Sequence, residues 1–525
     1  MVQFLKPLFL SGMNKMQYKK ACLFLGGIIL LIYFNTFRNG YALDDELVTG
    51  PQNYQTQHIS NLKEILTEWY QNEMGNRYEY RPLVKISYAI ENEIFGLEPG
   101  IHHFFNVLHY FLACLVLLVF LTDFFKGNFA FSLLAVLLFA IHPSHTEVVA
   151  SLKNRDILLS WIFSFLAGIQ LLRIQSNGEF SLTKWILVFV FFYLATLSKR
   201  DALIFVFVFP LLIILRNKTF LRHAFVSALF IVGAYLLLLL TMKVALSGEP
   251  EHRMLDFFEN PLYADRCISN RILAAFNSAG FYLIQTVFPF RQVCYYGYNQ
   301  IPLLESGTLY FFLGLIWVVG GMVTIFFFKR IPLHVKVGLV FFFGGMGLYL
   351  NFMRPVPGIV ADRFAFVSSV GTSLLLTGLI NYFFVLKPQS FSVWNNLKSS
   401  GKYFITCVFA IFIFLVVKRN NEWKDKETLF RTDCDNAPLS AKLHSLYALE
   451  LIHQFRNAEV GGGTNPQEKI STAKEHLRQA LAIYPDYANA LSNLGYLLLL
   501  TREQLPEARK LLEHSIQLVP DNAEV

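Results

Sequence analysis

The stretch FFNVLHYFLACLVLLVFLT, residues 104–122, decides what kind of protein this chain forms. A helix of about 17–25 mainly apolar residues is long enough to cross the hydrocarbon core of a bilayer. Eleven further apolar stretches accompany it. The full set lies at 20–37, 104–122, 128–142, 157–173, 184–198, 201–216, 223–243, 272–290, 307–328, 335–353, 364–386 and 402–418. The sequence therefore predicts an all-α polytopic membrane protein.

Composition and charge agree with a membrane chain. Hydrophobic residues make up 54% of the sequence, and the mean hydropathy is +0.43. The net charge is +8, and an excess of Lys and Arg is typical of the loops on the inner side of a membrane protein. Because this explains the charge, we expect no nucleic-acid partner. Lys15, Lys19 and Lys20 precede the first apolar stretch, and no small-residue cleavage motif follows it. This pattern predicts an uncleaved signal anchor.

The distribution of Lys and Arg also predicts the side on which each loop lies. Basic residues cluster at the N-terminus and in the loops around Lys126, Arg173 and Arg216, which are therefore predicted to be inside. The loops predicted to be outside are 38–103, 143–156, 199–201 and 244–271.

The stretch 272–290 determines the number of crossings. It carries Asn277, Gly280 and Gln285, which suit a re-entrant or tilted surface helix. If it crossed, the basic residues near Lys329 and Lys402 would lie outside, against the charge rule. We expect about eleven transmembrane helices and a C-terminus on the outside, with twelve crossings as the alternative.

The C-terminal region is a different kind of sequence. Ala473, Ala480 and Pro485 recur as Ala508, Ser515 and Pro520, each 35 positions later, which is a tetratricopeptide pattern of paired helices. We expect three parts, with a large outside loop, 38–103, in the first. They are a membrane domain over 1–420, a junction with a degenerate helical repeat over 421–470, and tetratricopeptide repeats over 471–525. Such repeats are typical of docking modules.

Ionisable residues gather in the loops predicted to be outside, next to the ends of the apolar stretches. Such residues beside a membrane are a first hypothesis for a functional site. His102, Asn106 and His109 fall on one helical face. The candidate site residues are Asp44, Asp45, Arg81, His102, His109, His142, His145, Glu147, Arg155, Lys199, Arg200, Asp362 and Arg363.

This set of acidic, basic and histidine side chains suits a reaction in which a hydroxyl group attacks a sugar and a lipid phosphate is the leaving group. An alcohol needs a carboxylate base, which Asp44 or Asp45 could supply. The departing phosphate needs fixed positive donors, and the histidines could serve either side of the reaction. The positive candidates are Arg81, Arg155, Lys199, Arg200 and Arg363. Two adjacent carboxylates should not titrate alike, and we favour Asp45 as the base.

The order of these motifs resembles the transmembrane and tetratricopeptide repeat-containing (TMTC) O-mannosyltransferases, glycosyltransferases of the GT-C fold. The motifs are the acidic pair, Arg81-Pro-Leu, His103-x-x-Asn106-x-x-His109, His142-Pro-x-His145-Thr-Glu147, Leu197-Ser-Lys199 and Ala361-Asp-Arg363. Arg419-Asn-Asn-Glu-Trp423 is similar to the junction between that family's membrane domain and its repeats. The chain departs from the family pattern at Arg200, where an acid is usual, and at Asp362, where Glu is usual.

The resemblance implies an inverting transfer of mannose from a polyprenyl-phosphate carrier to Ser or Thr of extracytoplasmic proteins. The acidic pair would hold the base, the repeats would help present the acceptor, and no cofactor or metal would be required. A divalent ion held by Asp44, Asp45 and nearby histidines is the alternative that we do not favour. The alternatives are transfer of a lipid-linked oligosaccharide, modification of a glycan or lipid, a transporter or flippase, and a membrane scaffold that is not an enzyme.

Two smaller features complete the predictions. The six cysteines form no CxxC motif, so no zinc site is indicated, while a Cys267–Cys294 bridge stays open. The sequon Asn217-Lys-Thr219 lies on the predicted inside, which gives no support to the endoplasmic reticulum. We therefore expect a bacterial inner membrane with a periplasmic active site, and the endoplasmic reticulum membrane is the alternative.

Overall fold

The computed structural model describes residues 15–73, 76–177, 181–247, 250–253, 257–265, 267–385, 394, 397–461 and 466–520. Most of these residues form helices. A short hairpin of β1 (Gln71–Glu73) and β2 (Asn76–Tyr78) pairs Gln71 with Tyr78 in antiparallel register. The predicted all-α class is therefore confirmed.

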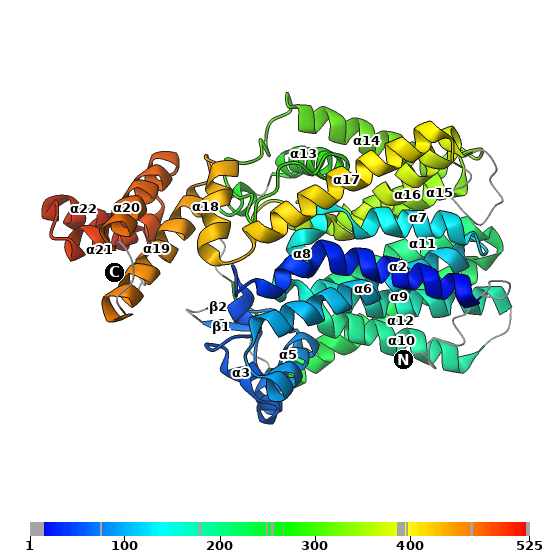
Figure 1. The fold of residues 1–525 in the computed structure, drawn as a ribbon, viewed down its shortest axis with the longest axis horizontal. Helices are drawn as coiled ribbons and strands as arrows, with labels where there is room; N and C mark the ends of the chain where they lie inside the picture. Colours follow the sequence, from blue (N-terminus) through cyan, green and yellow to red (C-terminus); the bar gives the residue numbers. More distant parts are fainter. Residues whose placement is uncertain are drawn as a thin grey trace.

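A bundle of long apolar helices forms the membrane domain (Figure 1). Seven helices of the described residues are long and apolar enough to cross a membrane. There are eight if α7 and the segment Pro143–Ala150, which meet at an angle of 61°, form one span. Many large apolar side chains on the outer faces stay exposed, as expected for a surface in contact with lipid. The helices of the whole bundle, which include shorter ones than these candidate spans, are α2 (Lys15–Tyr33), α6 (Pro99–Phe124), α7 (Phe129–Ala140), α8 (Thr146–Ala150), α9 (Arg155–Asn177), α10 (Leu182–Ser198), α11 (Phe205–Arg216), α12 (Leu221–Ala245), α13 (Ile268–Val287), α14 (Leu309–Phe326), α15 (Leu333–Met346), α16 (Ala365–Phe384) and α17 (Ser399–Glu422).

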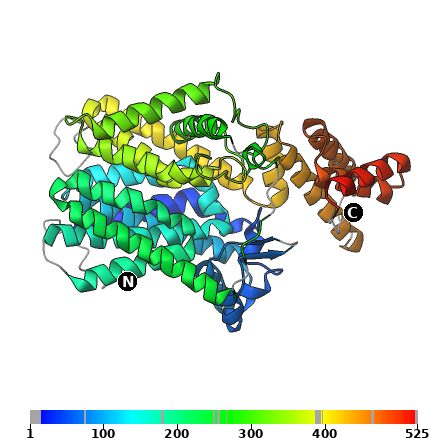
Figure 2. The same ribbon diagram turned by 180° about the vertical axis from the view of Figure 1, so that it is seen from behind.

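Helix α13 differs from its neighbours in direction. It is seen nearly end-on in Figures 1 and 2, while most helices of the bundle run across the picture. It is not one of the seven candidate spans, and its buried face carries Asn277 and Gln285. This orientation fits the expectation that 272–290 does not cross, and the count of eleven crossings stays a prediction.

The segments predicted to lie outside gather at one end of the bundle, where Figure 1 also shows the C-terminal helices. The first long loop folds as the hairpin and the helices α3 (Tyr54–Gln57), α4 (Leu62–Thr67) and α5 (Pro82–Phe95). Short 3-10 turns lie between the apolar helices and within the loops. They are η2 (Phe34–Arg38), η3 (Asp45–Leu47), η4 (Ile59–Asn61), η5 (Pro143–His145), η6 (Leu152–Asn154), η7 (Arg200–Ile204), η8 (Lys218–Phe220), η9 (Pro261–Tyr263), η10 (Gly347–Tyr349) and η11 (Asp362–Phe364).

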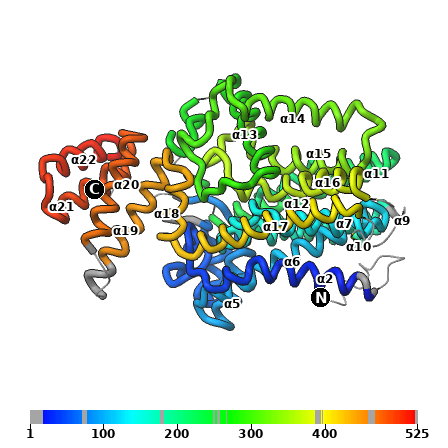
Figure 3. The backbone as a smooth tube through the Cα atoms, turned by 45° about the horizontal axis from the view of Figure 1, so that its top comes forward, coloured from blue at the N-terminus to red at the C-terminus, as the bar shows by residue number. Residues whose placement is uncertain are grey.

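The C-terminal region is a set of paired helices that project from the end of α17 (Figure 3). The small side chains of Ala473, Ala480, Ala508 and Ser515 are fully buried, as expected where the paired helices of a repeat touch. The usual tetratricopeptide period is about 34 residues, so the period of 35 in this chain requires one extra residue. The turn before α22 can take it up, because two of its residues have a positive φ, Arg502 at 54° and Gln504 at 46°. The helices are α18 (Lys426–Asn436), α19 (Ala441–Gly461), α20 (Pro466–Ile483), α21 (Ala488–Leu500) and α22 (Leu505–Leu518).

The suggested Cys267–Cys294 bridge is wrong, because all six cysteines are free. Cys267 is exposed before α13. Cys294 is buried, and its backbone N–H donates to Asp433 of α18 at 2.6 Å. The loop after α13 is thus tied to the junction by a hydrogen bond to a carboxylate instead of a disulfide.

Candidate active site

The acidic pair follows the first membrane helix in a tight turn, in which Leu43 has a φ of 47°. Asp45 points inward and is fully buried. Its Oδ2 accepts the backbone N–H of Ala42 at 3.0 Å, and its Oδ1 accepts the hydroxyl of Ser151 at 3.1 Å and the N–H of Lys153 at 3.0 Å. The Asp45 carboxylate therefore connects this turn to the loop between α8 and α9, and a substrate hydroxyl cannot approach it.

Asp44 points the other way. Its side chain is 46% exposed and forms an ion pair with Lys153. Burial favours the neutral acid, but the positive charges of Lys153, Arg363 and Lys442 outweigh this and lower the pKa of Asp44 below its usual 3.8. Burial raises the pKa of Asp45 to about 7. The two carboxyl groups titrate apart, and the accessible one stays ionised.

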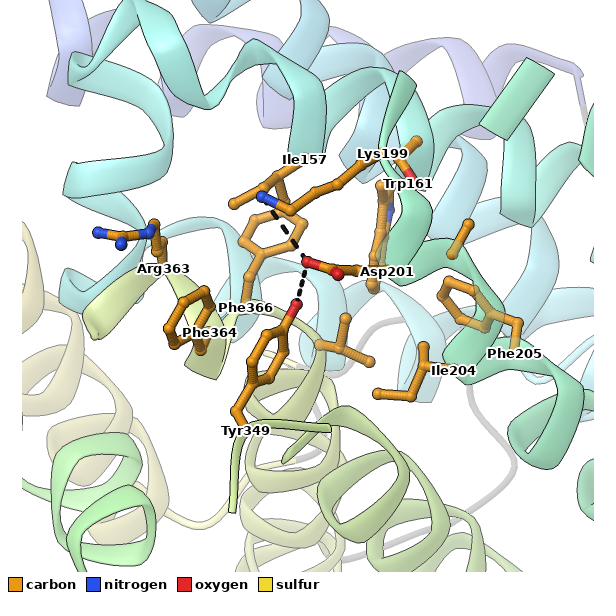
Figure 4. A pocket seen from close by; sticks show the side chains of 13 residues that line it. Ile157, Trp161, Lys199, Asp201, Ile204, Phe205, Tyr349, Arg363, Phe364 and Phe366 are labelled. Atoms are coloured by element: carbon orange, nitrogen blue, oxygen red, sulfur yellow. Dashed lines mark hydrogen bonds and ion pairs between the residues drawn. The ribbon is translucent and has the colours of Figure 1, made fainter. Parts of the chain in front are cut away.

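A pocket lies on the same face, between α9, η7, η10 and η11 (Figure 4). Its central polar groups are Lys199, Asp201 and Tyr349: Tyr349 donates its hydroxyl to Asp201 at 2.6 Å, and the Lys199 ammonium lies 3.8 Å from the same carboxylate. Arg363 also lines it. Its apolar wall consists of Ile157, Trp161, Ala202, Ile204, Phe205, Phe364, Phe366 and Val367.

The two cations of the pocket are held by buried carboxylates. Asp156, which is fully buried, accepts the Lys199 ammonium at 3.0 Å and also binds Arg81. Glu147 accepts the backbone N–H of Arg363 at 2.9 Å and pairs with its guanidinium. Because the Arg363 side chain keeps 25% exposure, its remaining N–H groups can still reach a ligand.

Arg155 and His102 belong to a sealed cluster behind the acidic pair. Arg155 is fully buried, binds both oxygens of Glu91 at 2.5 and 3.0 Å, and lies 3.7 Å from the centre of the Tyr88 ring. His102 Nδ1 lies 2.9 Å from Glu91, and its Nε2 lies 3.3 Å from Thr49. Their polar atoms are satisfied within the protein, so the structure places both in support of the loop and not in contact with the pocket.

Three further candidates are also buried in internal contacts. His142 bonds the carbonyl of Thr286 at 2.8 Å, and His145 contacts the hydroxyl of Tyr110 at 2.7 Å and that of Ser369 at 2.7 Å. The third is Asp362, which accepts Gln285 at 2.7 Å and the hydroxyl of Tyr296 at 3.0 Å. These side chains join the two halves of the bundle.

The last two candidates lie apart from the pocket lining. Arg200 pairs with both oxygens of Glu251 at 2.8 and 2.7 Å. His109 is half-buried on α6, and its Nδ1 bonds the carbonyl of Phe105, one turn earlier. The structure therefore brings together Asp44, Lys199 and Arg363 of the candidate set, with Arg81 and Glu147 directly behind them.

The candidate set lacks the carboxylates Asp156 and Asp201, which lie next to candidate residues in the sequence, and three further residues of the site. Lys153, the partner of Asp44, stands two positions before the candidate Arg155. Its position in the same predicted outside loop was a signal that could have identified it. Tyr349 is the last residue of the apolar segment that ends in η10, where no local pattern marks it. Lys442, whose charge acts on Asp44, comes from α19 in the repeat region, far away in sequence.

Comparison with known proteins gives a match to a repeat family at the C-terminal end and relatives along most of the chain. A family model described as "Tetratricopeptide repeat" matches residues 467–525. Human Protein O-mannosyl-transferase TMTC1 is 25% identical over 80% of this chain and 49% of its own length. Human TMTC3 is 23% identical over 94% of this chain and 60% of its own, and human TMTC4 is 26% identical over 81% and 63%. The predicted resemblance is confirmed, and the chain spans about half to three-fifths of these relatives.

Among solved structures, the chain is similar to ArnT from Cupriavidus metallidurans bound to undecaprenyl phosphate. The two share 14% sequence identity and align with a TM-score of 0.42. The alignment covers 94% of this chain and 75% of that one.

Proposed function

We propose that this chain is a GT-C type glycosyltransferase that transfers a sugar, mannose first among the expected ones, from a polyprenyl-phosphate carrier to Ser or Thr of a protein. The observation that carries the proposal is the exposed Asp44 carboxylate on the same face as a pocket that is lined by Lys199, Arg363 and several apolar side chains. The similarity to O-mannosyl-transferases over most of the chain supports the reaction class.

The pocket suits a lipid phosphate because it combines two kinds of lining. Lys199 and Arg363 offer positive donors to the phosphate, and Arg is the best geometric match for its oxygens. The aromatic and aliphatic wall formed by Trp161, Phe205 and Phe366 suits the first isoprene units. A donor bound in this way keeps its hydrocarbon tail in the bilayer and presents its sugar at the surface.

Asp44 takes the role of general base in this proposal, in place of the favoured Asp45, because a base must reach the proton that it removes. As the acceptor hydroxyl attacks the anomeric carbon, its proton passes to the Asp44 carboxylate. The bond between the sugar and the phosphate oxygen breaks, and the phosphate leaves on its lipid beside Arg363 and Lys199. Attack opposite the leaving group inverts the anomeric configuration.

The acceptor and the location are part of the same proposal. The repeats stand at the end of the bundle that carries Asp44, which suits presentation of a protein acceptor. We propose a periplasmic face of a bacterial inner membrane. The endoplasmic reticulum, the alternative location, would use the same geometry on its lumenal side.

The test is transfer by the purified full-length chain in lipid nanodiscs. Polyprenyl-phosphate mannose and Ser/Thr-rich peptides are the substrates, and mass spectrometry detects a hexose on the peptide. Transfer that requires Asp44 supports the proposal. A chain that binds the peptide but neither transfers nor hydrolyses any of a panel of polyprenyl-phosphate sugars would be a scaffold, and the proposal would fail.

A further inference from the structure

A cluster of metal-binding side chains lies at the start of the repeat region, outside the site described above. Cys434 of α18, His444 of α19 and His476 of α20 place one ligand atom each within 4.8 Å of one another. Cys434 and His444 are each 4% exposed, and His476 is half-buried. Three different helices therefore direct soft or borderline ligands to one point.

We propose that Cys434, His444 and His476 form a metal site that takes a zinc-class divalent ion. Thiolate and imidazole are the ligands that zinc prefers, at bonds of about 2.0–2.3 Å. Tetrahedral geometry places such ligands roughly 3.3–3.6 Å apart, so shifts of about 1 Å in the three side chains would complete the geometry. Water or the neighbouring exposed Asp435 supplies the fourth ligand.

The hydrogen bonds of His444 provide an independent observation in favour of the site. Its Nε2 lies 3.0 Å from the carbonyl of Pro438, which can only accept, so this nitrogen carries the proton. Its Nδ1 is therefore the bare nitrogen, and it faces Nδ1 of His476 at 2.8 Å. Histidines that bind metals usually donate their other N–H to a carbonyl or carboxylate in this way.

The site would fix the repeats to the membrane domain. Helix α18 follows α17 directly, whereas α19 and α20 form the first helical pair of the repeat region. A metal bound by all three would hold that pair against the junction. The ligands are separated by 9 and 31 residues, a spacing unlike that of compact zinc motifs, so the sequence pattern did not reveal them.

Titration of the purified full-length protein with Co2+ tests this site, because cobalt in a zinc site shows a thiolate-to-metal charge-transfer band. We expect the band to saturate at one equivalent of cobalt and to disappear when zinc is added. The variant Cys434→Ser should lose the band. Loss of a residue that only hydrogen-bonds to a metal ligand weakens metal binding roughly 10- to 100-fold. His476→Asn removes a ligand itself and should weaken cobalt binding by at least as much.

Cys267→Ser and His453→Asn are matched controls, since both residues are exposed and lie outside the cluster. Both should keep the band. Absence of the band in the unmodified protein, or its persistence in Cys434→Ser, overturns the site. If Cys434→Ser does not fold, thermal unfolding of the unmodified chain and of His476→Asn, with and without zinc, tests the site instead. Zinc should raise the midpoint of the unmodified chain but not that of His476→Asn, and an equal rise in both overturns the site.

Discussion

Asp44 and Asp45 are adjacent in sequence and have opposite environments, which separates their roles experimentally. Asp44→Asn removes an exposed carboxylate, so we expect a fall in sugar transfer of about 10²- to 10⁴-fold with unchanged stability. Asp45→Asn places an NH2 group against a backbone N–H and should cost about 1–3 kcal/mol of stability. Measuring the transfer rate and the thermal unfolding midpoint of both variants separates the loss of catalysis from the loss of stability. Full activity in Asp44→Asn would remove it as the base.

The pH dependence of transfer should report the ion pair between Asp44 and Lys153. The positive charge of Lys153 helps to keep the pKa of Asp44 below 3.8, so the base stays ionised as the pH falls. Lys153→Gln removes that charge, raises this pKa, and should shift the acid limb of the pH–rate profile to higher pH. Lys153→Arg keeps the charge and is the control. A limb that does not move in Lys153→Gln would separate this pair from catalysis.

The pocket cations give a third expectation at this scale. Arg363→Gln removes the donor that Glu147 orients, and we expect a loss of about 10²- to 10³-fold in kcat for the lipid-linked sugar. Arg456→Gln, an exposed position on α19, is the matched control and should transfer normally. Steady-state kinetics with polyprenyl-phosphate mannose distinguish the two. Equal kinetics would place the leaving phosphate elsewhere.

The sequence predicted the residue types of this site better than their individual roles. The candidates stand at helix ends on one face, and the pattern of acids, histidines and bases there was readable. Whether a polar side chain faces a pocket or a buried partner depends on segments far apart in the chain. His145 illustrates this, because its partner Ser369 is 224 residues away.

At the scale of elements, the Glu91–Arg155 pair holds α5 of the large loop against α6 and α9. Removing one member of a buried ion pair leaves an uncompensated charge and costs about 3–5 kcal/mol. We therefore expect Glu91→Ala to lower the thermal unfolding midpoint strongly. Glu305→Ala, at an exposed position in the loop before α14, should change it little. A midpoint in Glu91→Ala equal to that of the control would contradict this supporting role.

Helix identity was largely predictable from apolar length, and the repeats were predictable from their 35-residue period. Breaks within spans were harder to predict. The bend of 61° between α7 and the segment Pro143–Ala150 falls at Pro143, where His142 and His145 bond to residues far along the chain. The direction of α13 was expected only from the charge rule and its polar residues, because a helix of 20 residues is long enough to cross.

At the scale of the whole molecule, the repeats touch the membrane domain beside the proposed active site. The Lys442 ammonium of α19 lies 3.1 Å from Glu259 in the loop before α13. In the same loop, Phe258 packs its ring 4.7 Å from that of Tyr487, at the start of α21. The positive charge of Lys442 also acts on Asp44. Sequence patterns placed the repeats on this side but gave no indication of these contacts.

Charge reversal at this contact tests whether the repeats are docked in solution. Lys442→Glu places like charges together and should increase the distance between spin labels on α21 and the loop before α13, measured by pulsed electron resonance. Lys442→Glu combined with Glu259→Lys restores opposite charges and should recover the short distance, whereas Lys510→Glu, on an exposed face of α22, should leave it unchanged. If Lys442→Glu alone keeps the short distance, docking depends on the aromatic contact, and Phe258→Ala should then release the repeats.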